Sequence, residues 1–358
     1  MTNRIVLCCL LSLPAWTQEA SSGVELSGTV SVMAADSRQL TADPRDGSPF
    51  VAGFRAVLYP MWKLSEHWAI SAAVQAHSRP YFYEEFSTQG YGVKTDILQA
   101  NLGYSRIWKD RSIVIRLGQL SSAFGSFLLR YDDAVNPLID VPLSYGYYYQ
   151  GVSELGFTGA QADVTLGKLD ARAQFVNSSP ANRRTIFDRD QYGTWAGGLG
   201  YTIVQGFHLG VSSYHGPYLD RQYPFFFPGE AEPRDLPATA VGVDAQWGRG
   251  PWNIYGEWQR FQMDYRVIPT FLKQVGYAEA RRTLHPRWYV AARAGYMRAS
   301  AGPDRKAYEL AVGYRPSRWE LVKVGYEIQQ GPDIRGTSAN TLAVQLVTTF
   351  GPLSVAKN

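Results

Sequence analysis

Residues 287–296 read RWYVAARAGY, and this stretch decides the fold that we expect. Every second side chain belongs to an apolar set, which comprises Trp288, Val290, Ala292, Ala294 and Tyr296. Arg287, Tyr289 and Arg293 occupy alternate positions. Because successive side chains of a strand point to opposite faces, this alternation predicts a β-strand with one apolar and one polar face.

The same period of two recurs along the chain, whereas no segment has the apolar stripe of a helix. We expect about sixteen strands, at residues 24–35, 50–64, 67–80, 92–108, 112–121, 151–166, 168–177, 191–204, 206–217, 237–248, 251–263, 271–284, 286–298, 304–315, 318–330 and 337–350. Most exceed the roughly 5–6 residues of strands in globular proteins, and tilted strands that cross a bilayer need about 9–11 residues.

The connections between these strands alternate in length. Short links occur around residues 65–67, 109–111 and 249–250, and longer links such as 81–91 and 122–150 separate them. This rhythm is typical of an antiparallel up-and-down β-barrel with tight turns at one end and loops at the other. We therefore predict an all-β transmembrane barrel in which residues 122–150 form the third long loop.

The positions of tryptophan support a barrel with its short turns at one end. Six tryptophans lie beside short links on the apolar parity, namely Trp62, Trp68, Trp108, Trp247, Trp252 and Trp288. Because indole has an apolar body and a polar N–H, Trp gathers where a membrane meets water, and we expect a girdle at this end. The alternative is that Trp simply favours strand ends.

Composition excludes several classes of protein. The chain has 358 residues, of which 45% are hydrophobic, 14% aromatic and 18% charged, and it has two cysteines. The aromatic content argues against a disordered chain, and two cysteines are too few for a disulfide scaffold. No apolar run after residue 17 is long enough for a transmembrane helix. The net charge of +4 is too small to predict binding to nucleic acid.

The first residues have the features of a targeting segment. Arg4 precedes a short apolar run, and Ala15 and Thr17 are small residues at the positions that precede a cleavage site. We expect residues 1–17 to be a secretory signal peptide and residues 18–358 to form the barrel. A membrane anchor is the alternative, but the apolar run is short for spanning a bilayer.

Two positions depart from an ideal strand pattern. Pro60 lies inside an expected strand although proline cannot donate to a ladder, so we expect a bulge to absorb it. The last expected strand ends on Phe350, and the chain continues to Asn358.

Local segments resemble those of a known family. Residues 116–125, which read RLGQLSSAFG, resemble the strand-to-loop passage of general and phosphate-selective outer-membrane porins. Residues 159–163, 167–170 and 175–177 have a similar character. The resemblance implies a 16-stranded barrel in the outer membrane of a Gram-negative-type bacterium, often a homotrimer, through which small solutes diffuse. The chain does not end on Phe and lacks a Lys-rich stretch, so the resemblance implies no particular substrate.

The inward side chains of a wet barrel set its function. Strand parity places Arg55, Arg79, Arg116, Arg172 and Arg293 inward. The third loop carries four charged residues among apolar ones, namely Arg130, Asp132, Asp133 and Asp140. We expect this loop to enter the lumen, as it does in general porins, with its carboxylates facing Arg55, Arg79 and Arg116. The resulting field would orient polar solutes; scattered, solvated lumen charges are the alternative.

Signatures of an enzyme are absent from the sequence. The five histidines have no metal-ligand spacing, and there is no phosphate loop, dinucleotide fingerprint or G-x-S-x-G motif. We expect no enzyme activity, cofactor or metal.

The sequence therefore favours a passive diffusion channel for small polar or anionic solutes, surrounded by outer-membrane lipids. The first alternatives are a substrate-specific channel and a polymer-export barrel. Others are a non-conducting structural or adhesive surface barrel and a soluble secreted all-β protein.

Overall fold

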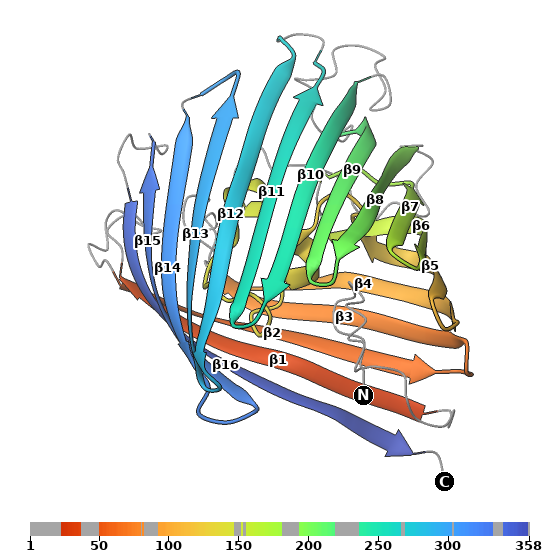
Figure 1. The fold of residues 1–358 in the computed structure, drawn as a ribbon, viewed down its shortest axis with the longest axis horizontal. Coiled ribbons are helices and arrows are strands. Elements are labelled where there is room, and N and C mark those ends of the chain that lie inside the picture. Colours follow the sequence, from red (N-terminus) through yellow and green to blue (C-terminus); the bar gives the residue numbers. More distant parts are fainter. Residues whose placement is uncertain are drawn as a thin grey trace.

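A computed structural model describes residues 23–36, 50–79, 81, 92–146, 152, 155–180, 193–218, 236–265, 269–302, 304–331 and 339–356. Sixteen strands form one closed barrel in which each strand pairs with its neighbours in sequence and β1 pairs with β16 (Figure 1). Every pairing is antiparallel. The predicted fold class and strand number are confirmed. The expected signal peptide, residues 1–17, lies outside the described residues.

The strands begin and end within a few residues of their predicted positions, except at the last strand. They are β1 (Gly23–Asp36), β2 (Phe50–Lys63), β3 (Trp68–Arg79), β4 (Gly92–Ile107), β5 (Arg111–Ser121), β6 (Leu155–Leu166), β7 (Leu169–Val176), β8 (Thr194–Val204), β9 (Phe207–Pro217), β10 (Pro237–Arg249), β11 (Trp252–Met263), β12 (Phe271–His285), β13 (Trp288–Ala299), β14 (Arg305–Tyr314), β15 (Glu320–Gln330) and β16 (Ala339–Ala356). Two short helices, η2 (Phe127–Arg130) and α1 (Leu143–Gly146), follow β5. Within the described ranges, no helix is long and apolar enough to cross a membrane.

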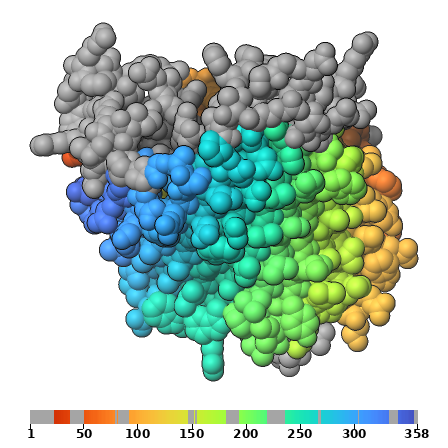
Figure 2. All heavy atoms as spheres, turned by 90° about the horizontal axis from the view of Figure 1, so that it is seen from above, coloured from red at the N-terminus to blue at the C-terminus, as the bar shows by residue number. Residues whose placement is uncertain are grey.

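The alternation in sequence becomes an alternation of faces around the barrel. In β13, Trp288 is 44% exposed on the outer face, whereas Arg293 on the inner face is 6% exposed. Large apolar side chains are likewise exposed on most other strands, including Val30, Leu58, Ile70, Leu117, Val211, Val243, Leu310, Val324 and Leu346. Figure 2 shows one side of this outer wall, where strands follow one another in sequence order. An apolar exterior on a sheet without an edge is the arrangement that lipid requires.

The predicted bulge at Pro60 is wrong. Pairing between β2 and β3 is interrupted between Leu58 and Met61, but the register is the same on both sides of the gap. Pro60 pairs with Leu26 of β1 on its other side. Because proline has no backbone N–H to donate, β2 loses its pairing with β3 at this point, but no extra residue is inserted into β2.

The last strand is longer than predicted. β16 continues beyond Phe350 to Ala356, which pairs with Gly23 at the start of β1. The register between β1 and β16 shifts between Leu26 and Gly28. Because the seam between β1 and β16 closes the barrel, this extension gives the first residues of β1 a partner on that side.

The six predicted girdle tryptophans lie at the strand ends that carry the short turns. Trp62, Trp68, Trp108, Trp252 and Trp288 are exposed on the outer face, and Trp247 is half-buried. Two of them pack against neighbouring rings, since Trp68 lies 5.1 Å from Tyr104 and Trp288 lies 4.4 Å from Tyr314 between ring centroids.

We predict that Gly28→Ala destabilises the seam between β1 and β16. A Cβ atom at Gly28 would lie 2.6 Å from Cζ of Phe350 and 2.8 Å from the carbonyl oxygen of Val57, so atoms must shift. Overpacking of this kind costs about 1–3 kcal/mol. The temperature at which the folded barrel loses its compact mobility on SDS gels should therefore fall.

Gly256→Ala in β11 is the matched control for this change. The nearest atom to its added Cβ is the carbonyl oxygen of Tyr277 at 3.6 Å, an ordinary contact. Its unfolding temperature should stay close to that of the unaltered chain, and equal temperatures for the two variants would contradict the described seam.

Candidate functional site

Residues 122–146, here called the inner loop, follow β5 and lie inside the barrel. Their side chains and backbone bond to inward-facing residues of strands on opposite sides, including Ser31 of β1 and Glu257 of β11. In Figure 1 the yellow segment is seen behind β10–β12, within the ring of strands. The third long loop thus enters the lumen, where it contacts much of the inner wall.

Apolar side chains account for the position of the inner loop. Phe124, Phe127 and Leu138 are fully buried. Phe124 lies 6.0 Å from Phe261 of β11 between ring centroids, and it belongs to a cluster with Met297 of β13. Because burial of one such side chain contributes about 1.5–3 kcal/mol, the loop is more stable against the wall than in water.

A first group of polar contacts joins the inner loop to β1 and β2, and we call it the β2 cluster. Asp133 accepts a hydrogen bond from Nη1 of Arg55 at 3.0 Å, and its other oxygen accepts bonds from Ser31 at 2.5 Å and Tyr81 at 2.8 Å. The guanidinium of Arg55 also donates through Nε to Gln75 at 2.7 Å. Both members of the ion pair are buried.

Lys323 of β15 adds a second cation beside this cluster. Its Nζ donates to the backbone oxygens of Asp133 at 2.6 Å, Asn136 at 2.8 Å and Leu138 at 3.0 Å. Burial alone would raise the pKa of Asp133, but Arg55, Lys323 and two hydroxyl groups outweigh it and lower that pKa below its ordinary 3.8. Asp133 is therefore a carboxylate at neutral pH.

A second group of contacts lies on the opposite wall, and we call it the β12 cluster. Here the loop supplies the cation, because Arg130 donates to Glu279 of β12 and, at 2.9 Å, to the hydroxyl of Tyr277. Arg293 of β13 joins the same carboxylate at 2.9 Å and donates to the backbone oxygen of Asp140 at 2.8 Å. The loop thus presents an anion to β2 and a cation to β12.

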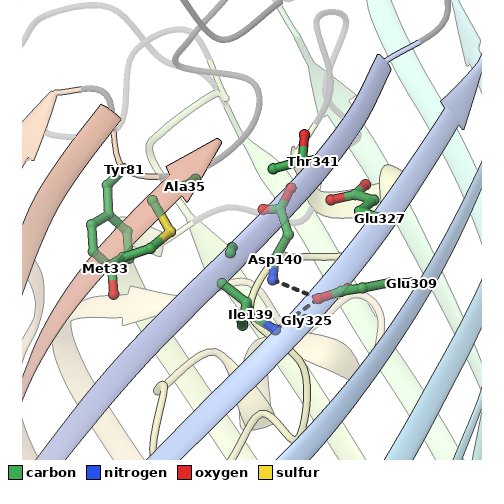
Figure 3. A pocket seen from close by; sticks show the side chains of 10 residues that line it. Met33, Ala35, Tyr81, Ile139, Asp140, Glu309, Gly325, Glu327 and Thr341 are labelled. Atoms are coloured by element: carbon green, nitrogen blue, oxygen red, sulfur yellow. Dashed lines mark hydrogen bonds between the residues drawn. The ribbon is translucent and has the colours of Figure 1, made fainter. Parts of the chain in front are cut away.

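The carboxylate of Glu309 in β14 binds the backbone of the inner loop at residues 139–140. Its Oε1 accepts hydrogen bonds from the N–H groups of Ile139 at 2.8 Å and Asp140 at 3.1 Å (Figure 3). Glu327 and Thr341 lie beside this contact around a small pocket. The carboxylate takes the place of the backbone acceptors that a regular element would provide.

Most of the predicted lumen charges lie in the contact between loop and wall. The buried members are Arg55, Arg130, Asp132, Asp133, Asp140 and Arg293. The loop covers most of these groups, which hold it in place, and Asp132 also lines a cavity beside the loop. The expectation of a loop carboxylate opposite a wall arginine is met by Asp133 and Arg55.

The ion-pair partner of Arg116 is a wall residue, although the loop carboxylate Asp132 lines the same cavity. Nη1 of Arg116 pairs with Asp163 on the adjacent strand β6, because that wall carboxylate is nearer than any carboxylate of the loop. Arg172 of β7 is half-buried, and among the described residues it has no ion pair within 4.0 Å. Arg79 ends β3 opposite Gly92, and its side chain lies outside what the structure describes.

A cavity of about 350 Å³ lies between the inner loop and the short-turn half of β1–β7, and we call it the loop cavity. Arg116, Asp163 and Arg172 line one part of it, and Leu128 and Val135 of the loop line another. Strand parity places two half-buried arginines in the lumen, and both of them, Arg116 and Arg172, line this cavity.

Sequence reasoning missed two of the wall residues that hold the inner loop. Glu279 and Glu309 share the inward parity of their strands, and the residues before each of them alternate between buried and more exposed positions. That parity could have identified them as inward, but not their partners in the loop. Within the described part of the chain, no group of three or more His, Cys, Asp or Glu side chains could hold a metal ion.

Solved structures with the same fold are outer-membrane proteins. An anion-selective porin from Comamonas acidovorans matches at a TM-score of 0.64 and 12% identity, over 93% of this chain and 100% of that chain. OmpF of Salmonella typhi, in complex with daunomycin, matches at 0.64 and 12% identity over 92% and 98%. OmpT of Vibrio cholerae matches at 0.61 and 11% identity over 93% and 99%.

No family model and no curated protein matches the sequence. At these identities the similarity establishes the fold, which is that of the outer-membrane porins.

We predict that Asp133→Leu releases the inner loop from β2. The change leaves the guanidinium of Arg55 buried without its carboxylate, and a broken buried pair costs about 3–5 kcal/mol. Backbone amides of residues 126–141 should then exchange hydrogen faster, as measured by mass spectrometry on the refolded barrel.

Two further variants make this test specific. The double variant Arg55→Met with Asp133→Leu should recover slow exchange, because apolar groups replace the pair. Arg111→Ala removes an exposed pair with Asp110 at 3.7 Å and should change nothing. Unchanged exchange in Asp133→Leu would show that the β2 cluster does not hold the loop.

Proposed function

We propose that this protein is a non-enzymatic outer-membrane channel through which small polar or anionic solutes diffuse passively. The observation that carries the proposal is the loop cavity, in which the half-buried Arg172 has no ion pair among the described residues. Glu25, Asp132 and Asp163 line the same cavity, so its field comes from charges of both signs, and Arg172 supplies the part that attracts anions. The anion selectivity named for the porin from Comamonas acidovorans agrees with this assignment.

The outer face supports a location in the bilayer. The exposed apolar band contacts lipid tails, and the six tryptophans at the short turns form the girdle at one interface. Export to the outer membrane of a Gram-negative-type bacterium uses residues 1–17 as a signal peptide. A homotrimer is the proposed assembly, since one structure with this fold is described as a trimer form.

A non-conducting surface barrel is the second candidate. It is favoured by the apolar cluster that packs between the inner loop and β6–β13, which includes Phe124, Tyr214, Phe261 and Met297. A channel needs a continuous aqueous path beside this cluster. Electrical conductance separates the two candidates, because a filled barrel carries no current.

We predict stable channels in planar bilayers with a preference for chloride over potassium in a KCl gradient. Arg172→Glu should shift the reversal potential toward that of a cation-selective channel, because it replaces a positive charge of the loop cavity with a negative one. Arg111→Glu, at an exposed turn, should leave the reversal potential nearly unchanged. Absence of conductance in the unaltered barrel would refute the proposal.

Low pH should increase the conductance of the channel. The ionic contribution of Asp133 is complete above its ordinary pKa of 3.8 and is lost as pH falls through its lowered pKa in the folded barrel. We predict a rise in conductance below about pH 4 that depends on Asp133. In Asp133→Asn this acid step should be missing; a step of the same size there would assign it to another carboxylate.

A further inference from the structure

Arginine is concentrated on one side of the short-turn end of the barrel. The segments 249–252, 282–288 and 315–319 contain the turns that connect β10 to β11, β12 to β13 and β14 to β15. Each segment ends on a tryptophan, and together they carry five arginines and no aspartate or glutamate. We propose that these segments, here called the arginine collar, bind the headgroups of anionic phospholipids in the leaflet beside the short turns. The inference rests on the proposed location in the bilayer and not on conductance.

Arg282 is the member of the collar that lies within a strand on the lipid-facing wall. It has the outward parity of β12, it is exposed, and it pairs in register with Trp252 of β11 and Val290 of β13. Val290 is two residues farther from the turn than Trp288 of the girdle. A charged side chain among lipid-facing apolar ones is unfavourable unless its head reaches the interface, which a long arginine side chain can do.

The described part of the protein supplies no counter-ion for Arg282. Its side chain has no ion pair and no hydrogen bond among the described residues. The outward positions of β11–β14 hold no aspartate or glutamate. The guanidinium lies 5.2 Å from the ring centroid of Trp252. A cation–π contact of this kind orients the guanidinium but leaves its N–H donors without acceptors.

The other outward members of the collar surround this position with the same charge. Arg249, Arg287 and Arg318 are exposed, and none of them has an ion pair within the described ranges. The guanidinium of Arg318 lies 4.4 Å from the ring centroid of Trp319, so a second arginine of the collar rests on a tryptophan. Several guanidinium groups therefore face the same leaflet.

The charge is unevenly distributed around the barrel. Glu320, which follows the third segment, is the one acidic residue next to the collar in sequence. The turn after β2 contains Glu66, and the turn after β4 contains Asp110, which lies 3.7 Å from Arg111. Arg106 of β4 also lies over a tryptophan ring, but Asp110 is in the same turn. The surplus of positive charge thus lies on the β10–β15 side.

Charge and geometry select the ligand. A guanidinium binds a phosphate group with two parallel hydrogen bonds. The tryptophans of the collar are exposed on the outer face, and indole gathers where headgroups meet acyl chains. The phosphate at this level is that of a membrane lipid. Because each arginine near an anionic surface contributes about 1 kcal/mol, phosphatidylglycerol is favoured over a zwitterionic lipid whose ammonium group the collar would repel.

Native mass spectrometry of the refolded barrel in detergent tests this preference. The probes are phosphatidylglycerol and phosphatidylcholine with the same acyl chains. We expect an apparent Kd about tenfold lower for phosphatidylglycerol, where a factor of ten corresponds to about 1.4 kcal/mol. Arg282→Gln should reduce the preference several-fold, and its combination with Arg287→Gln and Arg318→Gln should abolish it. Arg282→Lys keeps the charge and should retain most of the preference.

Arg111→Gln is the matched control. It removes an exposed arginine from a short turn that contains a carboxylate, and it should leave the preference for phosphatidylglycerol unchanged. Equal losses in Arg111→Gln and Arg282→Gln would show that net charge alone attracts the lipid, and the collar proposal would be overturned. Compact mobility on SDS gels checks that each variant is folded.

Two further measurements separate the lipid from other occupants of this surface. An excess of inorganic phosphate should not displace phosphatidylglycerol; displacement would assign the collar to dissolved anions and overturn the proposal. A second copy of the chain is the other occupant. Loss of oligomers in Arg282→Gln with unchanged lipid binding would assign the surface to that copy and likewise overturn the proposal.

Conductance in planar bilayers keeps this proposal distinct from that of the channel. A conducting barrel that binds both lipids equally would overturn the collar proposal and leave the channel. A barrel that selects phosphatidylglycerol through Arg282 without conducting would overturn the channel and leave the lipid site. Absence of both signals would overturn both.

Discussion

Closure of the sheet is the constraint on which the rest of the structure depends. In lipid every backbone N–H and C=O group needs a partner within the protein, so a strand edge cannot remain open. Pairing of β1 with residues 342–356 of β16 removes that edge. Because the closed wall satisfies the backbone and faces lipid with apolar side chains, the interior is free to hold charge.

The charged side chains of the interior fix the inner loop in one orientation. The loop offers a carboxylate, Asp133, to the arginine of the β2 cluster, and an arginine, Arg130, to the carboxylate of the β12 cluster. Turning the loop around would bring like charges together on both walls, with no water to screen them. Buried ion pairs add little to stability over apolar contacts, but here they select one placement of an otherwise apolar segment.

The placement of the loop also decides which part of the wall borders a cavity. Contacts with β1, β2 and β11–β15 occupy one part of the lumen, and the loop cavity lies beside β1–β7 on the short-turn side. Arg116 and Arg172 face this cavity, while Arg55 and Arg293 are covered. The arginines that hold the loop and the arginines that line the loop cavity are thus different residues, whereas Asp132 of the loop borders the cavity as well.

Much of the wall could be predicted from the sequence, because alternation depends only on local geometry. The face of Trp288 and of Arg293 follows from a period of two, whatever the rest of the chain does. The partner of a charge does not follow from parity: Arg116 pairs with the next strand, and Glu279 with a loop residue far away in sequence. Pro60 and the extension of β16 depend on neighbouring strands, which a single segment does not specify.

The most direct test of this account is cysteine accessibility along β6 during current recording. The only cysteines in the chain are Cys8 and Cys9, which precede the first strand, so single introduced thiols are read without interference once that segment is removed. Gln161 lines the loop cavity, and Ala162 has the opposite parity. We expect a water-soluble, charged thiol reagent to reduce the current of Gln161→Cys and to leave Ala162→Cys unchanged. Equal reaction at both positions, or no current to reduce, would contradict a closed wall around an aqueous path.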